Sequence, residues 1–218
     1  MRDAESIKSL IRSLPPGLKL VAVSKFKPIG DIMLAYDAGV RDFAENRPQE
    51  LKQKMEALPN DIRWHFIGHL QTNKIKMIID RVSLIHSVDS LRLLNEIDRE
   101  ASKRGLTKDV LLQIFIASEE SKLGLSSDEL KEILEIKDRF KNIRFCGLMG
   151  MASFTENRAV VRSEFAKLKE LFDITKREYF ADCSYFCELS MGMSGDYDIA
   201  AEEGSTMVRI GSLIFGER

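Results

Sequence analysis

The segment Leu18-Lys19-Leu20-Val21-Ala22-Val23-Ser24-Lys25 carries the clearest structural signal of the chain. Its apolar, partly β-branched residues are bounded by Lys27-Pro28, which predicts a buried strand. Because side chains alternate along a strand, Val21, Val23 and Lys25 share one face. Apolar surroundings lower the pKa of an ammonium, which is what a Schiff-base lysine needs. A lysine that extends from the strand end into solvent stays open as the alternative.

Short apolar runs of this kind alternate with longer amphipathic runs along the chain. The apolar runs predict strands at Leu18–Phe26, Asp42–Asn46, Arg63–Gly68, Leu84–Val88, Asp109–Ile116, Ile143–Gly150, Phe186–Ser190 and Met207–Gly211. The amphipathic runs predict helices at Ile29–Ala38, Pro48–Ala57, Asn73–Arg81, Ser90–Lys103, Ser127–Arg139, Asn157–Arg177 and Tyr197–Glu203. Eight strands alternating with seven helices, without a linker, predict a single parallel (β/α)8 barrel of the TIM type.

The barrel is expected to span residues 1–218 as one domain, with residues 1–15 forming an N-terminal helix that packs on its wall or floor. A chain of 218 residues is short for this fold, which typically takes about 250, and little room is left for a helix after Gly211. A doubly wound open sheet is the structural alternative, because strand counts from one sequence are uncertain by about one or two.

Composition narrows the function classes. The chain has 33 basic and 34 acidic residues, so no net charge favours nucleic acid or an anionic membrane as a partner. No apolar run approaches the roughly 18 residues of a membrane span, and no secretory signal is evident at the N-terminus. The three cysteines, Cys146, Cys183 and Cys187, fit neither a disulfide framework nor a metal site. We therefore expect a cytoplasmic protein without a metal.

The loops after the last two predicted strands are rich in glycine and serine. They read Ser190-Met191-Gly192-Met193-Ser194-Gly195-Asp196 and Arg209-Ile210-Gly211-Ser212. Phosphate often binds these two loops in barrel proteins, because glycine admits close backbone approach and serine offers a short donor. Each loop taken singly reads as a turn. Together, opposite a lysine on the first strand, they predict a site for a carbonyl compound that bears a phosphate.

Two further residues are expected inside the barrel. Arg209 alternates with apolar neighbours on the last strand, so it faces either a heterocyclic nitrogen of a ligand or a buried ion-pair partner, for which Glu188 is the candidate. His65, flanked by aromatic residues, is expected to be a packed, hydrogen-bonded core histidine and not a catalyst.

Six segments, in order along nearly the whole chain, resemble the pyridoxal phosphate homeostasis protein family, whose members are similar to the N-terminal barrel of alanine racemase. They are Ala22–Lys25, Phe43–Arg47, Trp64–Lys74, Gly147–Met149, Leu189–Ser194 and Val208–Ser212. One departure is Ser212, where the family commonly has threonine, and the hydroxyl is retained. The resemblance implies a fold-type III barrel that binds pyridoxal 5′-phosphate (PLP).

The resemblance also implies a role for each site residue. Lys25 would carry PLP as a Schiff base, and Ser190, Gly211 and Ser212, with help near Ser194, would hold the phosphate. Arg209 would face the pyridine nitrogen, Asn46 would lie near the cofactor, and Met191 would pack around the ring.

The expected function is to store, buffer or hand on PLP, which affects amino-acid and keto-acid metabolism indirectly. Racemisation needs a second acid–base group. The resemblance to alanine racemases implies that this group would be a tyrosine from the C-terminal β-domain of the partner subunit. The chain, which stops at Arg218, is expected to lack that domain. An arginine opposite the pyridine nitrogen also weakens the cofactor as an electron sink. We therefore expect no turnover and no catalytic residue.

Two alternatives stay open at this point. One is a fold-type III amino-acid racemase or a related PLP enzyme, and the other is a Schiff-base phosphosugar lyase that uses Lys25 without a cofactor. The expected partners are PLP and, as candidates, PLP-dependent apo-enzymes. The expected assembly is a monomer or a weak homodimer.

Overall fold

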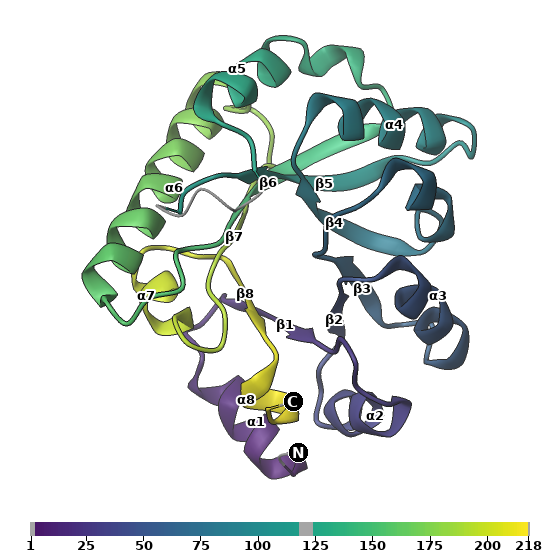
Figure 1. The fold of residues 1–218 in the computed structure, drawn as a ribbon, viewed down its shortest axis with the longest axis vertical. Coiled ribbons are helices and arrows are strands. Elements are labelled where there is room, and N and C mark those ends of the chain that lie inside the picture. Colours follow the sequence, from purple (N-terminus) through teal and green to yellow (C-terminus); the bar gives the residue numbers. More distant parts are fainter. Residues whose placement is uncertain (1–2, 118–123, 218) are drawn as a thin grey trace.

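The structure is a computed structural model that describes residues 3–117 and 124–217, so the remaining residues of the expected domain 1–218 lie outside the described ranges. Within these ranges eight parallel strands close into a barrel in which β1 pairs with both β2 and β8 (Figure 1). The strands are β1 (Lys19–Val23), β2 (Asp42–Glu45), β3 (Arg63–Phe66), β4 (Val82–Val88), β5 (Lys108–Ile114), β6 (Ile143–Gly150), β7 (Glu188–Ser190) and β8 (Met207–Ile210). The barrel expectation is confirmed, and the open-sheet alternative is wrong.

Helices surround the barrel on the outside (Figure 1). They are α1 (Ala4–Ser13), α2 (Ile29–Asp37), α3 (Pro48–Ala57), α4 (Leu91–Ser102), α5 (Ser127–Glu135), α6 (Arg158–Tyr179), α7 (Tyr197–Glu202) and α8 (Ser212–Phe215), with 3-10 turns η1 (Thr72–Met77) and η2 (Lys137–Arg139). Serine caps behave as their chemistry predicts. At α5, Ser126 Oγ accepts from Glu129 N at 3.2 Å, and the Glu129 carboxylate accepts from Ser126 N at 2.8 Å.

The α1 helix packs beside α2 on the outer wall, where Ile7 and Leu10 join the hydrophobic layer between strands and helices. This large layer is the outer core. Side chains on the opposite strand faces fill the barrel as a smaller inner core. Its members are Val21, Val23, Ala44, Leu84, Leu111, Cys146, Met149 and Met207. The alternation expected for the first strand is therefore confirmed, because Val21 and Val23 point inward and Ala22 lies in the outer core.

Three connections differ from the sequence expectation. The predicted helix Ser127–Arg139 ends at Glu135 as α5, and Lys137–Arg139 forms the separate 3-10 turn η2. The predicted helix Asn73–Arg81 is the shorter 3-10 turn η1. Because β4 already begins at Val82, a helix that ran to Arg81 would leave no residues to connect it to the strand. Ile78 N and Ile79 N both donate to Ile75 O, which winds the chain tightly. After β8 the chain forms one helical turn, α8, although the short chain predicted little room for a helix there.

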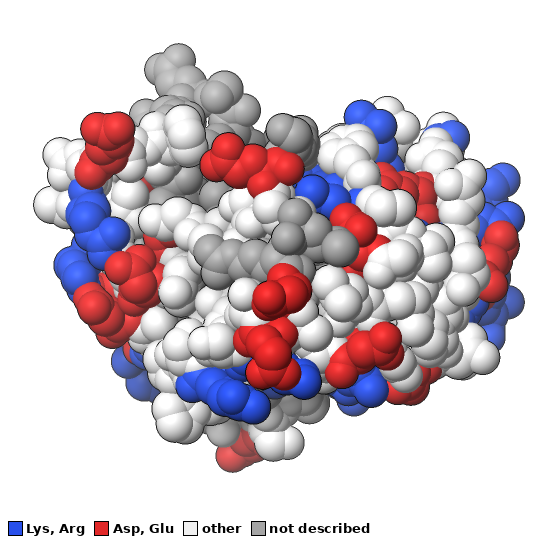
Figure 2. All heavy atoms as spheres, turned by 90° about the horizontal axis from the view of Figure 1, so that it is seen from below, with Lys and Arg blue, Asp and Glu red and all other residues white. Residues whose placement is uncertain are grey.

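Surface charge is mixed. Lysine and arginine side chains are interspersed with aspartate and glutamate side chains on the face in Figure 2. Several are ion pairs, such as Arg162 with Glu202 and Glu203. None of the helices in the described ranges has the length and apolar character that a membrane crossing requires.

Candidate functional site

A cavity of about 690 Å³ opens at the carboxyl ends of the strands, the end at which barrel proteins carry their sites. Its wall is built from the loops that follow the strands. Residues from six of these loops are Lys25, Asn46, Gly68, Met151, Ser194 and Gly211. The sheet thus brings together residues that are distant in sequence.

Lys25 lies two residues beyond β1 and lines the cavity, above the inward-facing Val21 and Val23. Lys27 lines the same cavity but is committed elsewhere. Its Nζ donates to Phe215 O at 3.0 Å and to Gly216 O at 3.3 Å, which ties the β1 loop to the end of α8. Lys25 has the same strand parity as the inward-facing Val21 and Val23.

A charged network lies next to Lys25 in the chain, and we call its members Ser24, Phe26, Glu45, Glu50 and Lys54 the Lys54 network. Ser24, Glu45 and Lys54 are buried, whereas Glu50 is partly exposed and Phe26 is exposed. Lys54 Nζ donates to Ser24 O at 2.8 Å and to carboxylate oxygens of Glu45 and Glu50, both at 2.7 Å. Glu50 also accepts from Phe26 N at 2.6 Å, and Phe26 has a left-handed φ of 64°.

The Lys54 network holds the backbone on both sides of Lys25 and the residue before Asn46. Burial raises the pKa of Glu45, against the hydrogen bonds from Lys54 and Ser24. Sequence reasoning missed this network. The i, i+4 spacing of Glu50 and Lys54 was its only sequence signal, and that spacing is typical of an exposed helical ion pair.

Asn46 lines the cavity. Its Oδ1 is buried and has no hydrogen-bond partner among the described residues. Gly68 allows the backbone of Asn46 to pack closely against it, because a Cβ on Gly68 would lie 2.2 Å from Asn46 O. A side-chain amide offers both a donor and an acceptor, so Asn46 keeps an unused acceptor beside the cavity.

The loops after β7 and β8 meet at the cavity, as expected. Gly211 N donates to Ser194 Oγ at 3.2 Å, and Ser212 lines the wall beside them. The Ser194 hydroxyl still carries a proton that it can donate to an anion. Gly192 makes the turn possible, since its φ is +94° and a Cβ there would lie 2.5 Å from Ala200 Cβ.

Arg209 is buried and is one of the residues that line the cavity. Nη1 donates to Ser190 Oγ at 2.7 Å and Nη2 donates to Gly150 O at 3.0 Å. In the described part of the chain no carboxylate lies within ion-pair distance of it. Burial lowers the pKa of Arg209 to about 10, so the group stays charged at neutral pH.

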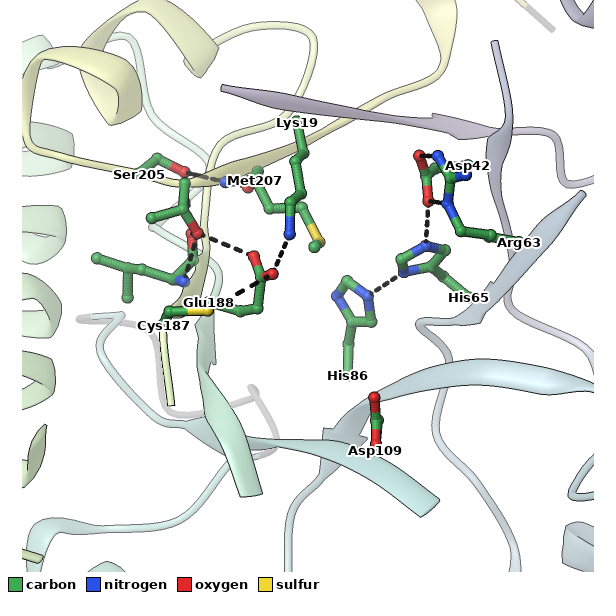
Figure 3. A network of polar contacts seen from close by, with 12 residues as sticks. Lys19, Asp42, Arg63, His65, His86, Asp109, Cys187, Glu188, Ser205 and Met207 are labelled. Atoms are coloured by element: carbon green, nitrogen blue, oxygen red, sulfur yellow. Dashed lines mark hydrogen bonds and ion pairs between the residues drawn. The ribbon is translucent and has the colours of Figure 1, made fainter. Parts of the chain in front are cut away.

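The alternative role of Arg209, an ion pair with Glu188, is wrong. Glu188 instead forms an ion pair with Lys19 and accepts from Thr206 Oγ1 at 3.2 Å (Figure 3). The register explains the difference. Ser190 pairs with Met207, so Glu188 lies below the level of Met207 and Arg209 lies above it.

Two predicted site residues do not reach the cavity wall. Ser190 is fully buried, and its Oγ contacts Arg209 and lies 3.1 Å from His86 Nδ1. Met191 belongs to the outer core. Both therefore lie behind the wall that Lys25 and Asn46 help to form.

Comparison with known proteins places this barrel in a class. A family model described as alanine racemase, N-terminal domain, matches residues 4–218. Relatives named pyridoxal phosphate homeostasis protein include one from Aquifex aeolicus, 44% identical over 201 residues, with coverage of 92% of this chain and 87% of the relative. Another, from Synechocystis, is 43% identical over 211 residues, with coverage of 96% and 95%.

Solved structures agree. PipY of Synechococcus elongatus with PLP bound is 35% identical and superposes with a TM-score of 0.89, covering 98% of this chain and 99% of that one. Alanine racemase of Bartonella henselae is 16% identical with a TM-score of 0.71, covering 99% and 61%, and shows likeness of fold alone. The chain belongs to the pyridoxal phosphate homeostasis protein family.

Proposed function

We propose that the cavity binds PLP and that the protein stores, buffers or hands on this cofactor without turnover of its own. The observation that carries the proposal is the convergence of Lys25, Arg209 and the Ser194–Gly211 pair on one cavity. A relative of known structure, PipY, has been solved with PLP bound, which supports the same assignment.

The residues present fit the cofactor. When bound, PLP supplies an aldehyde that condenses with a primary amine and a pyridine ring that withdraws electrons. Lys25 would hold it covalently, and Ser194, Gly211 and Ser212 would donate hydrogen bonds to its phosphate. Asn46 would offer its unused amide, while Ser190 and Met191 would support the wall from behind.

Arg209 favours binding over turnover. A charged guanidinium donates hydrogen bonds and keeps its protons at neutral pH, so a pyridine nitrogen that it faces would stay an acceptor. An unprotonated ring is a weak electron sink, which disfavours removal of a proton from an amino acid bound to it.

The cavity wall also supports this view, because three side chains with acid–base chemistry, Tyr36, His69 and Tyr197, do not line it in the described ranges. Tyr36 Oη donates to Asp61 at 2.8 Å, and His69 Nδ1 lies 3.1 Å from Asp89. The third, Tyr197, starts α7 behind the wall. We extend the proposal to a single cytoplasmic domain, a monomer or weak homodimer, that passes PLP to apo-enzymes.

The test is hydrogen exchange at Cα. The holoprotein is incubated with L-alanine and with L-serine in deuterated water and the amino acids are analysed by NMR. We expect no exchange on the enzyme timescale, together with transfer of PLP to an apo-enzyme faster than free dissociation allows. Exchange at about 1 per second or faster would contradict the proposal and favour an amino-acid racemase or a related enzyme.

A further inference from the structure

A line of hydrogen bonds runs from Arg209 through the interior of the barrel. Arg209 Nη1 lies 2.7 Å from Ser190 Oγ, which lies 3.1 Å from His86 Nδ1. His86 Nε2 lies 2.8 Å from His65 Nδ1, and His65 Nε2 lies 3.0 Å from Asp42 Oδ1. We call these five residues the Arg209–Asp42 relay. Figure 3 shows the part of the relay that ends at Asp42, with His86 and His65 directed toward each other and Asp42 beyond His65.

The relay is buried almost throughout. Ser190 and His86 are fully buried, and Arg209 and His65 are exposed by 3% and 4%. Hydrogen bonds between buried polar groups are needed to offset the loss of water, so each link contributes to a defined arrangement. None of Ser190, His86, His65 and Asp42 lines the cavity, so the proposed binding of PLP does not by itself account for them.

The chemistry at the two ends fixes the outer links, and with two neutral imidazoles it leaves a single direction for the links between them. A guanidinium only donates and an ionised carboxylate only accepts. Ser190 Oγ accepts from Arg209, and its own proton then goes to His86 Nδ1. His86 is protonated on Nε2 and donates to His65 Nδ1, and His65 donates from Nε2 to Asp42. This proton order requires that each imidazole carry a single proton.

The charged groups around the relay agree with this arrangement. Burial, with a smaller contribution from the charge of Arg209, holds the pKa of His86 well below its usual range, so this imidazole stays neutral. Arg63 Nε donates to Asp42 Oδ1 at 2.8 Å and helps to keep that carboxylate ionised. Asp196 acts on Arg209 through space, whereas Asp42 is the carboxylate that hydrogen bonds connect to it.

We propose that His86 and His65 are positioning residues that hold the Arg209 guanidinium in place through a proton-ordered relay anchored on Asp42. This rests on the proposed function in one respect, namely that the guanidinium faces the pyridine nitrogen of PLP. A carboxylate in direct contact would take up the donors of Arg209 and weaken its field. A neutral hydroxyl and the Gly150 carbonyl orient the group and leave its charge for the ligand.

The first test needs no cofactor. The chain has three histidines, and the control, His69, is half-exposed beside Asp89. Nitrogen-15 NMR of the protein at neutral pH should show His65 and His86 each protonated on Nε2 alone. The variants His69→Asn and His86→Asn assign the signals. A doubly protonated His65, or an Nδ1 proton on His86, would overturn the relay whether or not PLP binds.

The second test measures dissociation constants for PLP and for 1-deaza-PLP, in which carbon replaces the ring nitrogen. His86→Leu should weaken PLP binding about tenfold, which corresponds to about 1.4 kcal/mol, and should leave 1-deaza-PLP binding unchanged. His86→Asn keeps an acceptor near the Nδ1 position and should recover most of the loss, while His69→Asn should match the wild type. Ser190→Ala removes one atom from the relay and should reproduce the His86→Leu pattern if that variant does not fold.

The outcomes separate the two proposals. Equal weakening of PLP and 1-deaza-PLP would mean general damage to the cavity and would overturn the positioning role. A wild-type protein that binds neither compound would contradict the proposed function, and the NMR result would still decide the relay.

Discussion

Lys54 Nζ donates a 2.8 Å hydrogen bond to the carbonyl oxygen of Ser24, the residue directly before Lys25. Lys54 is 5% exposed, and it also contacts the fully buried Glu45, the residue before Asn46. One ammonium therefore holds the ends of two neighbouring strands, and each strand delivers a residue to the cavity.

Replacing Lys54 by methionine should destabilise the fold by roughly 3–5 kcal/mol, because Glu45 would be left as a buried charge without its partner. Urea denaturation measures the loss. Lys52→Met on the exposed side of the same helix is the matched control and should change stability by no more than about 0.5 kcal/mol. Adding Glu45→Gln to Lys54→Met should recover part of the loss, and the absence of recovery would mean that charge is not the cause.

Borohydride reduction of the holoprotein should fix the cofactor on Lys25, and peptide mapping by mass spectrometry locates it. Lys25→Ala should abolish the fixed cofactor. Lys27→Ala should retain it, because the Lys27 ammonium is held by the carbonyls of Phe215 and Gly216. A pyridoxyl group on Lys27 or Lys74 in the wild type would contradict the assignment.

Removing the hydroxyls of Ser194 and Ser212 should lower PLP affinity at least tenfold, since a hydrogen bond to a charged group contributes roughly 1.5–3 kcal/mol. Affinity for unphosphorylated pyridoxal should change little. Fluorescence titration with both ligands makes the comparison. Equal loss for both would place the phosphate elsewhere. Ser190→Ala is informative beside this pair, because Ser190 contacts Arg209 and should affect both phosphorylated and unphosphorylated ligands.

Acid should weaken the fold through Asp42. Burial raises the pKa of Asp42, but hydrogen bonds from His65 and Arg63 outweigh it and lower that pKa from 3.8 to about 2. The folded-state pKa lies below the unfolded value, so the ionised carboxylate stabilises the fold above pH 3.8. That contribution is lost as the pH falls from about 4 to about 2.

Asp42→Asn should therefore lower the free energy of unfolding by roughly 2 kcal/mol near neutral pH, and the difference should shrink toward pH 2. His86 acts in the same direction at higher pH. Its folded pKa is well below 6.5, so the unfolded chain takes up a proton first and stability falls as the pH drops below 6.5. Denaturation curves across this range measure both effects. A constant Asp42→Asn difference between pH 7 and pH 2 would contradict the Asp42 assignment.

Much of the fold followed from local pattern. Strand period placed Val21, Val23 and Lys25 on one face, and the structure keeps that face inward. His65 is a packed, hydrogen-bonded core histidine, as expected from its aromatic neighbours. These features depend on residues close in sequence, so a single sequence contains the information for them.

The contacts that sequence did not predict depend on register between strands. Parity allowed Arg209 to meet Glu188, but the pairing of Ser190 with Met207 separates them in height. The relay has the same origin, because His65 and His86 lie on strands whose pairing shifts between Trp64 and His65. Such a shift follows from barrel closure and leaves no trace in the local pattern.

The seam between β1 and β8 gives the cavity a further property. Val21 pairs with Arg209 across it, and a Cβ on Gly211 would lie 3.3 Å from Val23 O, so the two sides of the site come from opposite ends of the polypeptide. Contacts between segments so far apart are slow to form and costly in chain entropy. The site is therefore complete only after the ring has shut, and any ligand held there stabilises the shut ring by mass action. The concentration of PLP would then contribute to the free energy of unfolding of the protein.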